Sequence, residues 1–415
     1  MAMIKRRIGV RGSAGGVTLL LSSRMRVRRR AAIVAAIVCL MLGLGYIAGH
    51  SYLRGAVHAR GADDECGAAG MHGAVRTVAD WEAQDVTEER LSVPWRSGTL
   101  PARKYLPRRI SGRVFLLVPG VHASGVDEPR LIGFARDLAA MGHPVVTVGP
   151  SDLARYSISP QVTDAIEDAG AWLSQQKDLA PDGRIGMMGI SFAGGLSIVA
   201  AGRPSLANKV ALVLSLGGHG ELPRTMRYLC TGIEPDGQQR PPHDYGVVII
   251  LLGVADRVVP PDQVSGLQKG VLMFLEASRL DLFDKAQSMA EFQRARDYAT
   301  TLPEPSRTMM NYVNDRDVAH LGPILLPHVA ELGGDPSLSP AMAPPPAAPV
   351  YLLHGAGDNV IPAAETQALA ATLTSRGVTT HALVTPLITH AEVDRAATAA
   401  DAWALVGFWS DVLSR

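Results

Sequence analysis

Short apolar runs that alternate with amphipathic segments constrain the fold of this chain more than any other feature. A continuously apolar run of a few residues is typical of a strand buried on both faces. Strands that alternate with helices form parallel sheets covered by helices on both sides. The sequence therefore predicts an α/β fold, with strands in VFLLVPG (114–120), PVVTVGP (144–150), RIGMMGIS (184–191) and ALVLSLGG (211–218).

The segments around these runs complete the predicted element order. Helices are expected at about 128–141, through Ile166 and Trp172, and in FAGGLSIVAAG after residue 191. Before the first run, EERLSVPWRSGTLPARKYLP is typical of two strands joined at an Arg-Ser-Gly turn. A mostly helical block at about 219–346 follows the last run and ends in a proline-rich stretch, so it is expected to be a lid domain inserted into the sheet.

Alternation of strands and helices resumes after this block. Strands are expected at 350–355 and 381–386, with a helix at about 362–376 between them. A C-terminal helix through Trp403 and Trp409 completes the domain.

The N-terminus predicts a membrane anchor. Residues 31–49, AAIVAAIVCLMLGLGYIAG, carry no charge, and as a helix they would span roughly 28 Å, close to one hydrocarbon core. Only basic charges precede this span, so residues 1–30 are expected in the cytoplasm and the remainder on the periplasmic or extracellular side. A cleaved signal peptide is the alternative, because Val57-His58-Ala59 offers small residues to a peptidase. Residues 50–85 are expected to be a linker, and residues 86–415 a domain.

Charge and cysteine content exclude two other classes of protein. The formal net charge is +1, but without the nine Lys and Arg residues that precede the first acidic residue the remainder carries −8. This acidic body offers no basic surface for nucleic acid. Cys39 lies in the apolar span, so only Cys66 and Cys230 are available to pair in an oxidising compartment, and a disulfide framework is excluded.

The segment G-I-S-F-A-G-G (189–195) is the candidate catalytic motif. It lies between a buried strand and a helix of small residues, the context in which a serine occupies a sharp turn as an exposed nucleophile. The usual pattern is G-x-S-x-G, whereas here Ala193 takes the place of the last glycine, and Gly194 and Gly195 follow. The motif alone fits a serine in an ordinary glycine-rich turn, such as a phosphate-binding loop, equally well.

With this motif the chain resembles the α/β-hydrolase superfamily, most nearly its dienelactone-hydrolase-like and serine-esterase branches, over roughly 86–415. In that family the order along the chain is nucleophile, acid and base, with the acid after a late strand and the histidine after the last strand. Ser191, Asp358 in HGAGDNVIP and His390 in VTPLITHAEV occur in this order at these places. The resemblance therefore implies an α/β-hydrolase fold and a triad of Ser191, Asp358 and His390.

A second aspartate carries the same local pattern as Asp358. The segment 253–260 repeats the G-x-x-D-x-V-x-P pattern of 355–362, and Asp256 also follows an apolar run. Spacing favours Asp358, because 32 residues separate it from His390 and leave room for one helix and one strand, whereas 134 residues separate Asp256 from His390. The segment 245–259 is instead expected to be a buried lid helix that ends at Pro260 and Pro261.

Two further histidines are alternatives to His390 as the base. Active groups in open α/β sheets gather at the carboxyl ends of the strands. His381 begins its predicted strand, whereas His390 lies just past the end of that strand. His354 falls within a strand and is expected to be a packed, hydrogen-bonded core residue.

Such a triad would hydrolyse a carboxylic ester through an acyl-enzyme, without a metal or an organic cofactor. Two backbone N–H groups would hold the oxyanion. Phe192, the residue after the nucleophile, supplies one; by resemblance the turn after VFLLVPG supplies the other, with Val121 as the first choice and His122 as the second. The His122 side chain either lines the pocket or is exposed without a role.

The substrate is expected to be a small ester with an apolar acyl or aromatic group. Apolar stripes of the lid are usually core packing, but they would also line a pocket above the nucleophile. The stripe residues singled out for this are Leu272, Phe274 and Leu275.

Three other functions fit parts of the pattern. Acyl transfer or thioester cleavage would use the same triad. A catalytically silent hydrolase-fold binding module at the membrane would keep the fold without the activity. Asp315, Asp317 and His320 form a loose metal-ligand pattern, which helix capping by Asp317 explains better.

Overall fold

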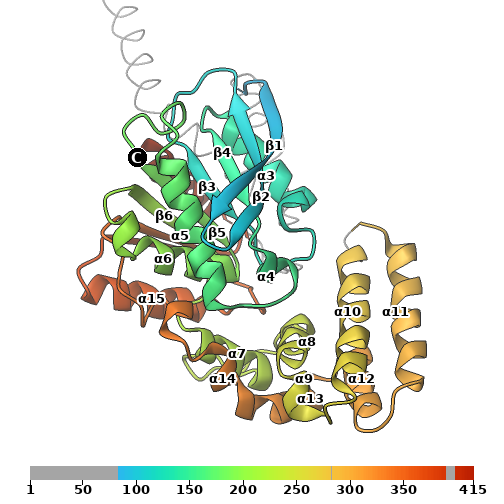
Figure 1. Ribbon diagram of the computed structural model, residues 1–415. Coiled ribbons are helices and arrows are strands. Elements are labelled where there is room, and N and C mark those ends of the chain that lie inside the picture. Colours follow the sequence, from blue (N-terminus) through green and yellow to red (C-terminus); the bar gives the residue numbers. More distant parts are fainter. Residues whose placement is uncertain (1–82, 282, 389–397) are drawn as a thin grey trace, which may run out of the picture. The chain divides into compact units, whose positions relative to one another are not determined.

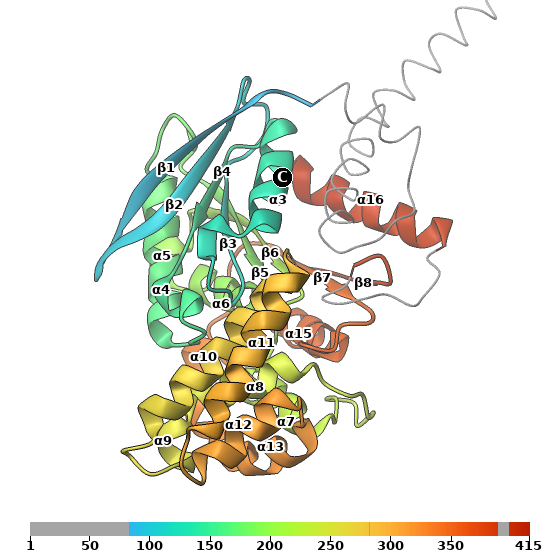
Figure 2. The same cartoon turned by 90° about the vertical axis from the view of Figure 1, so that its right-hand side faces the viewer.

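The sheet has the strand number and the mostly parallel arrangement that the sequence predicts. The computed structural model describes residues 83–281, 283–388 and 398–415. Within these residues one eight-stranded sheet runs in the order β1-β2-β4-β3-β5-β6-β7-β8 (Figures 1 and 2). The two N-terminal strands form an antiparallel hairpin that pairs antiparallel with β4, and all further pairs are parallel. The strands are β1 (Val86–Trp95), β2 (Gly98–Pro107), β3 (Phe115–Val118), β4 (Val145–Val148), β5 (Ile185–Ile190), β6 (Val210–Leu216), β7 (Val350–Gly355) and β8 (Thr380–Thr385).

Helices cover both faces of this sheet, because the side chains of each strand alternate between two packed layers. In β3, Phe115 and Leu117 pack in the layer of α3 (Pro129–Ala140) and α16 (Ala399–Ser414), which lie side by side in Figure 2. Leu116 and Val118 belong to the other layer. The helices of that layer are α5 (Pro160–Ser174), α6 (Phe192–Ala201) and α15 (Ala363–Ser375). The short helices η1 (Gly125–Asp127), α4 (Ser151–Ala154) and η2 (Pro204–Leu206) connect these elements.

A helical insertion separates β6 from β7 and lies beyond one end of the sheet in both views (Figures 1 and 2). The segment 245–259 is helical as predicted, but it is divided at Val254, and Pro260 follows the second helix. The insertion contains α7 (Leu222–Thr231), α8 (Asp244–Gly253), α9 (Ala255–Val258), α10 (Val264–Leu280), α11 (Lys285–Thr300), α12 (Ser306–Asn314), α13 (Val318–Leu325), η3 (Leu326–His328), α14 (Val329–Gly333) and η4 (Pro336–Leu338).

Helix capping accounts for the acidic residues considered above as metal ligands. The side chain of Asp317 accepts a hydrogen bond from the His320 N–H at 3.1 Å, as the N-cap of α13. The capping interpretation is therefore confirmed. No group of three or more ligand-type side chains with metal-binding geometry is found among the residues that the structure describes.

Several predictions concern residues outside the described ranges. These are the tail 1–30, the apolar span 31–49, the linker up to residue 82, Cys66 and His390. Among the described helices, none combines the length and apolar character needed to cross a bilayer. Cys230 is buried on α7, and burial raises the pKa of its thiol to about 12.

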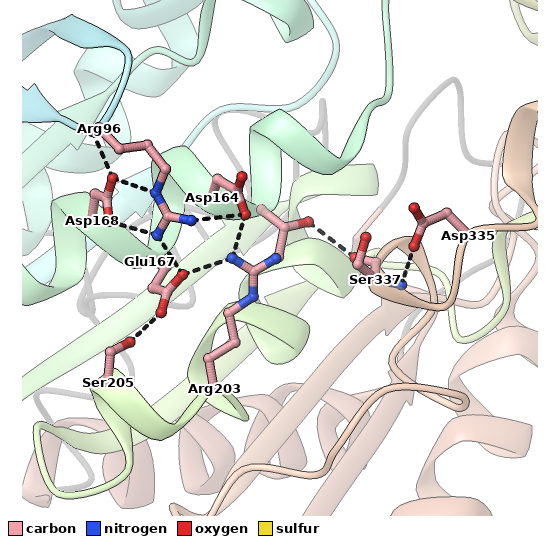
Figure 3. A network of polar contacts seen from close by, with 9 residues as sticks. Arg96, Asp164, Glu167, Asp168, Arg203, Ser205, Asp335 and Ser337 are labelled. Carbon is pink, nitrogen blue, oxygen red and sulfur yellow. Dashed lines mark hydrogen bonds and ion pairs between the residues drawn. The ribbon is translucent and has the colours of Figure 1, made fainter.

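Two arginines and three carboxylates tie the β1–β2 turn to α5 and to the segment after α6 (Figure 3). Arg96 in the turn binds Glu167 at 2.7 Å and Asp168 at 2.8 Å, and Arg203 binds Glu167 at 2.7 Å. Ser205 also donates to Glu167. Burial alone would raise the pKa of Glu167, but the hydrogen bonds from Ser205, Arg203 and Arg96 lower it below its ordinary value. Glu167 and Asp164 thus each bind both arginines, and Glu167 also accepts from Ser205.

Glu167→Gln should lower the free energy of unfolding by about 2 kcal/mol at pH 7, since charge-assisted hydrogen bonds at a largely buried carboxylate are lost. The folded pKa of Glu167 is lower than the unfolded one, so its stabilisation is full above the unfolded value of about 4.3 and is lost as the pH falls through the folded value. The variant should therefore also lose stability less steeply at acid pH.

Urea unfolding at neutral and acid pH checks this expectation. Glu331→Gln is the matched control, because Glu331 pairs with Arg257 at 2.5 Å while its side chain is 57% exposed. An exposed pair of this kind contributes below about 1 kcal/mol. Equal losses in the two variants would contradict a special role for the buried network.

Candidate active site

Ser191 occupies the sharp strand-to-helix turn that its motif predicts. It joins β5 to α6 with φ 55° and ψ −134°, a backbone conformation that L-residues rarely adopt. The turn is held from both sides, because the Ser191 N–H donates to the Leu216 carbonyl at 2.7 Å and the Ser191 carbonyl accepts from the Gly194 N–H at 2.8 Å. The fold thus maintains a strained serine at the end of a central strand.

Close backbone packing explains which glycines this turn requires. A Cβ atom on Gly189 would lie 2.2 Å from the Ala193 carbonyl oxygen, and one on Gly194 would lie 2.3 Å from the Ser215 Oγ. A Cβ on Gly195 would lie 2.7 Å from the His219 carbonyl oxygen, so Gly189, Gly194 and Gly195 are all sterically required. Ala193 is fully buried in the hydrophobic core, so the departure from G-x-S-x-G leaves the turn intact.

The two amides expected to hold an oxyanion flank this turn. A Cβ on Gly120 would lie 3.1 Å from the Ser191 Cβ, so the loop after β3 closely approaches the serine. Val121 follows in that loop, and Phe192 is the first residue of α6, whose first N–H groups have no partner within the helix. Neither the Val121 nor the Phe192 N–H donates to a backbone carbonyl in the described part of the chain. Both amides are therefore available to a ligand.

Asp358 and Asp256, which share the same local sequence pattern, have different surroundings. Asp358 follows β7 and is 1% exposed, and its Oδ1 accepts from the Val360 N–H at 2.9 Å and from the Ile361 N–H at 3.0 Å. Asp256 lies on α9 in the insertion, with its side chain 58% exposed. Gly355 and Val360, on either side of Asp358, line the same cavity as Ser191.

His354 is a buried core residue, as predicted, and it also contacts the candidate acid. Its Nε2 lies 2.8 Å from the Ile361 carbonyl oxygen and 3.1 Å from the Asp358 Oδ2. Because the Ile361 carbonyl can only accept, Nε2 carries the proton, and Nδ1 then accepts from the Thr366 hydroxyl at 2.6 Å. His354 therefore fixes the orientation of Asp358, a role that the sequence analysis missed although the two residues are four positions apart.

The candidate base lies outside the described residues. The structure describes the chain after β8 up to Ile388, two positions before His390, and Ile388 lines the cavity at Ser191. His381 lies near the start of β8, where its ring stacks on that of Tyr351 with 4.6 Å between the centroids. His381 does not line the cavity. The assignment of His390 stays a prediction.

A cavity of about 380 Å³ adjoins Ser191, and its two sides differ in character. The sheet, α3 and α16 contribute mainly apolar side chains. The insertion, the loop after β3 and the first turn of α3 contribute polar ones. The apolar lining includes Leu131, Phe134, Ile190, Leu353, Ile388 and Trp409, and the polar lining includes His122, Arg130, His243, Tyr245, Arg279 and Arg316.

The apolar stripe of the insertion does not line this cavity. Phe274 and Leu275 are buried in the insertion, where Phe274 packs on Phe292 with ring centroids 5.2 Å apart. Leu272 is 44% exposed. Core packing, the usual role of such stripes, is confirmed for Phe274 and Leu275, because the face of α10 that carries them packs within the helical insertion, and the second role in lining a pocket is not found for any of the three residues.

Tyr245 of α8 joins the insertion to the loop after β3. Its hydroxyl donates to the Val121 carbonyl oxygen at 3.2 Å. Burial raises the pKa of Tyr245 well above its ordinary value, so the hydroxyl remains a donor. Sequence reasoning missed this contact because 124 positions separate the two residues.

The sequence matches no protein-family model and no curated protein. Solved structures with a similar fold include an esterase of Pyrobaculum calidifontis, with 16% identity, a TM-score of 0.45, and coverage of 81% of this chain and 90% of that chain. A thermostable esterase of Pseudomonas putida has 14% identity, a TM-score of 0.44, and coverage of 82% and 88%. A bacterial brefeldin A esterase has 15% identity, a TM-score of 0.42, and coverage of 87% and 86%.

These values describe a loose likeness of the backbone, so the fold assignment rests on the molecule itself. The sheet is mostly parallel, and β5 lies near its centre. The strained turn at Ser191 follows directly after β5. An acidic residue follows β7, after a helical insertion between β6 and β7. By these features, the chain has the α/β-hydrolase fold.

Proposed function

We propose that this chain is a serine hydrolase that cleaves a carboxylic ester through an acyl-enzyme. The observation that carries the proposal is the strained backbone of Ser191 at a turn that lines a cavity, beside two backbone amides that donate to no backbone carbonyl of the described residues. Strain of this kind persists where the surrounding structure enforces it, and it is common at functional sites. If this turn had no function, a glycine would be expected in place of Ser191, because glycine adopts this backbone conformation without strain.

The chemistry follows from the roles of three side chains. His390 takes the proton of the Ser191 hydroxyl while Oγ forms a bond to the ester carbonyl carbon. Asp358 accepts a hydrogen bond from the imidazole and stabilises its positive form, and His354 holds Asp358 in place. The Val121 and Phe192 N–H groups donate to the oxyanion of the tetrahedral intermediate.

The intermediate collapses when His390 returns the proton to the leaving alcohol oxygen and the ester C–O bond breaks. Water then attacks the acyl-enzyme, with His390 as the base. The acid leaves and the proton returns to Ser191 Oγ. No step requires a metal or an organic cofactor.

A panel of p-nitrophenyl esters with increasing acyl length tests the proposal. The cavity of about 380 Å³ and its apolar side support a short or medium acyl chain. We expect kcat/KM to rise over the first few methylene groups and then to fall. Added alcohols that divert the acyl group into new esters would indicate an acyltransferase instead. The absence of turnover with every ester would contradict the proposal.

Tyr245→Phe should lower kcat about tenfold with little change in KM, because the Val121 carbonyl loses its donor and the adjacent oxyanion amide is less well oriented. Tyr298→Phe is a matched control, since the Tyr298 hydroxyl also donates to a backbone carbonyl, that of Gly266, at 3.2 Å. Steady-state kinetics of both variants check this. An equal loss in the control would indicate a general effect of the insertion.

For localisation, we propose that residues 31–49 anchor the chain and that the hydrolase domain lies on the periplasmic or extracellular side. The charge distribution around the apolar span supports this orientation.

A further inference from the structure

His122 presents to the candidate active site a hydrogen-bond donor that no described residue uses. It follows Val121 in the loop after β3 and lines the cavity at Ser191. The Ser124 N–H donates to its Nδ1 at 3.3 Å. Since Nδ1 accepts this bond, the proton of the neutral ring is on Nε2. Nε2 is buried and has no hydrogen-bond partner in the described part of the chain.

The groups around His122 are already bound to one another. Glu128 accepts from Arg130 at 2.7 Å and from the Leu131 N–H at 2.7 Å. Glu276 accepts two bonds from Arg279, at 2.7 and 2.6 Å. Neither carboxylate is a hydrogen-bond partner of the His122 Nε2, which has none among the described residues. Burial lowers the pKa of His122, so the ring is neutral near pH 7 and Nε2 remains a donor without a charge.

A buried donor without a partner is uncommon in native proteins and calls for an explanation. The roles in the proposed reaction are all assigned to other groups. The oxyanion is held by the Val121 and Phe192 amides, and the proton is moved by His390. His122 is also unsuited to act as a base, because Nε2 is protonated and Nδ1 is occupied by the Ser124 N–H.

We propose that His122 determines specificity by donating from Nε2 to an oxygen atom of the substrate that lies outside the reacting ester group. The substrate class is then an oxygen-substituted ester rather than a plain alkyl ester. This inference rests on the proposed hydrolase function. The acceptor oxygen belongs either to the acyl part or to the alcohol part of the substrate, and in both cases the recognition is one neutral hydrogen bond.

Matched ester pairs that differ by oxygen in place of one methylene group test the inference on the full-length chain. p-Nitrophenyl methoxyacetate against p-nitrophenyl butyrate tests the acyl part, and 2-methoxyethyl butyrate against n-butyl butyrate tests the alcohol part. The measured quantity is the ratio of kcat/KM within each pair, divided by the same ratio for hydroxide-catalysed hydrolysis. Because the ratio comes from one preparation, it does not depend on how much of a variant folds.

His122→Phe should lower this ratio about tenfold in one of the two pairs, which identifies the part of the substrate that carries the oxygen. His122→Gln, which keeps an N–H donor near the position of Nε2, should restore part of the ratio. His320→Phe, which changes an exposed histidine of the insertion, should leave both ratios unchanged.

Unchanged ratios in both pairs for His122→Phe, with the wild-type chain active on p-nitrophenyl butyrate, would overturn this inference and leave the hydrolase function standing. A lower ratio that His122→Gln does not restore at all would assign the effect to packing and would also overturn it. No turnover of any ester by the wild-type chain would overturn the hydrolase function and this inference with it.

Discussion

Asp358→Asn should lower kcat for ester hydrolysis by about 10⁴-fold while the chain remains folded, because an amide presents the wrong hydrogen-bond partner to the catalytic imidazole. The amide oxygen can still accept from the Val360 and Ile361 N–H groups, and His354 retains the Ile361 carbonyl as an acceptor. Thermal melts beside the kinetics separate chemistry from folding.

Asp256→Asn is the matched control for this change, since both aspartates carry the same sequence pattern. Asp256 lies on the insertion with its side chain 58% exposed, so activity should stay near that of the wild type and the melting temperature should change little. Loss of turnover in Asp256→Asn at an unchanged melting temperature, with Asp358→Asn active, would contradict the assignment of the acid.

Replacement of Ser191 should separate activity from stability. Ser191→Ala and Ser191→Gly should each lose on the order of 10⁶-fold in kcat, because both remove the nucleophile. Only Ser191→Gly should raise the melting temperature, since glycine adopts φ 55° without the strain that serine and alanine share there. We expect a difference of about 1 kcal/mol in the free energy of unfolding between the two variants.

Calorimetry on the two variants measures this difference, with ester hydrolysis as the second readout. If Ser191→Gly melts at or below the temperature of Ser191→Ala, the turn is not strained. Residual hydrolysis near the wild-type level in either variant would mean that another residue attacks the substrate.

The strands and the serine turn could be predicted because short stretches of sequence determine them. The apolar runs that became β3 to β7 are bounded by turn residues, and the sheet pairs them as buried strands. The turn at Ser191 could be predicted because Gly189, Gly194 and Gly195 are sterically required beside it. Each of these features is encoded within about ten residues of sequence.

The repeated G-x-x-D-x-V-x-P pattern occurs in two different structures, so a local pattern alone could not identify the acid. The apolar run before Asp256 forms α8, whereas the run before Asp358 forms β7 between β6 and β8. Periodicity does not distinguish a short buried helix from a buried strand. Tertiary pairing decides the outcome, and only the spacing to His390 indicated it in the sequence.

Long-range contacts at the site could not be read from the sequence at all. The Tyr245 hydroxyl reaches Val121 across 124 positions, and no local pattern marks either residue. The apolar residues Phe274 and Leu275 fitted a pocket as well as a core, but the face of α10 that carries them packs within the insertion. The apolar side of the cavity comes instead from elements such as α3 and α16, at opposite ends of the domain sequence.

Covalent labelling tests the central claim, that Ser191 is a nucleophile, most directly. A fluorophosphonate should add one phosphonyl group to the chain, and fragmentation of the tryptic peptide 185–209 should locate it on Ser191 rather than on Ser197 or Ser205 of the same peptide. Ser191→Ala should remain unlabelled. An adduct at another residue, or no adduct on a folded wild-type chain, would contradict the account.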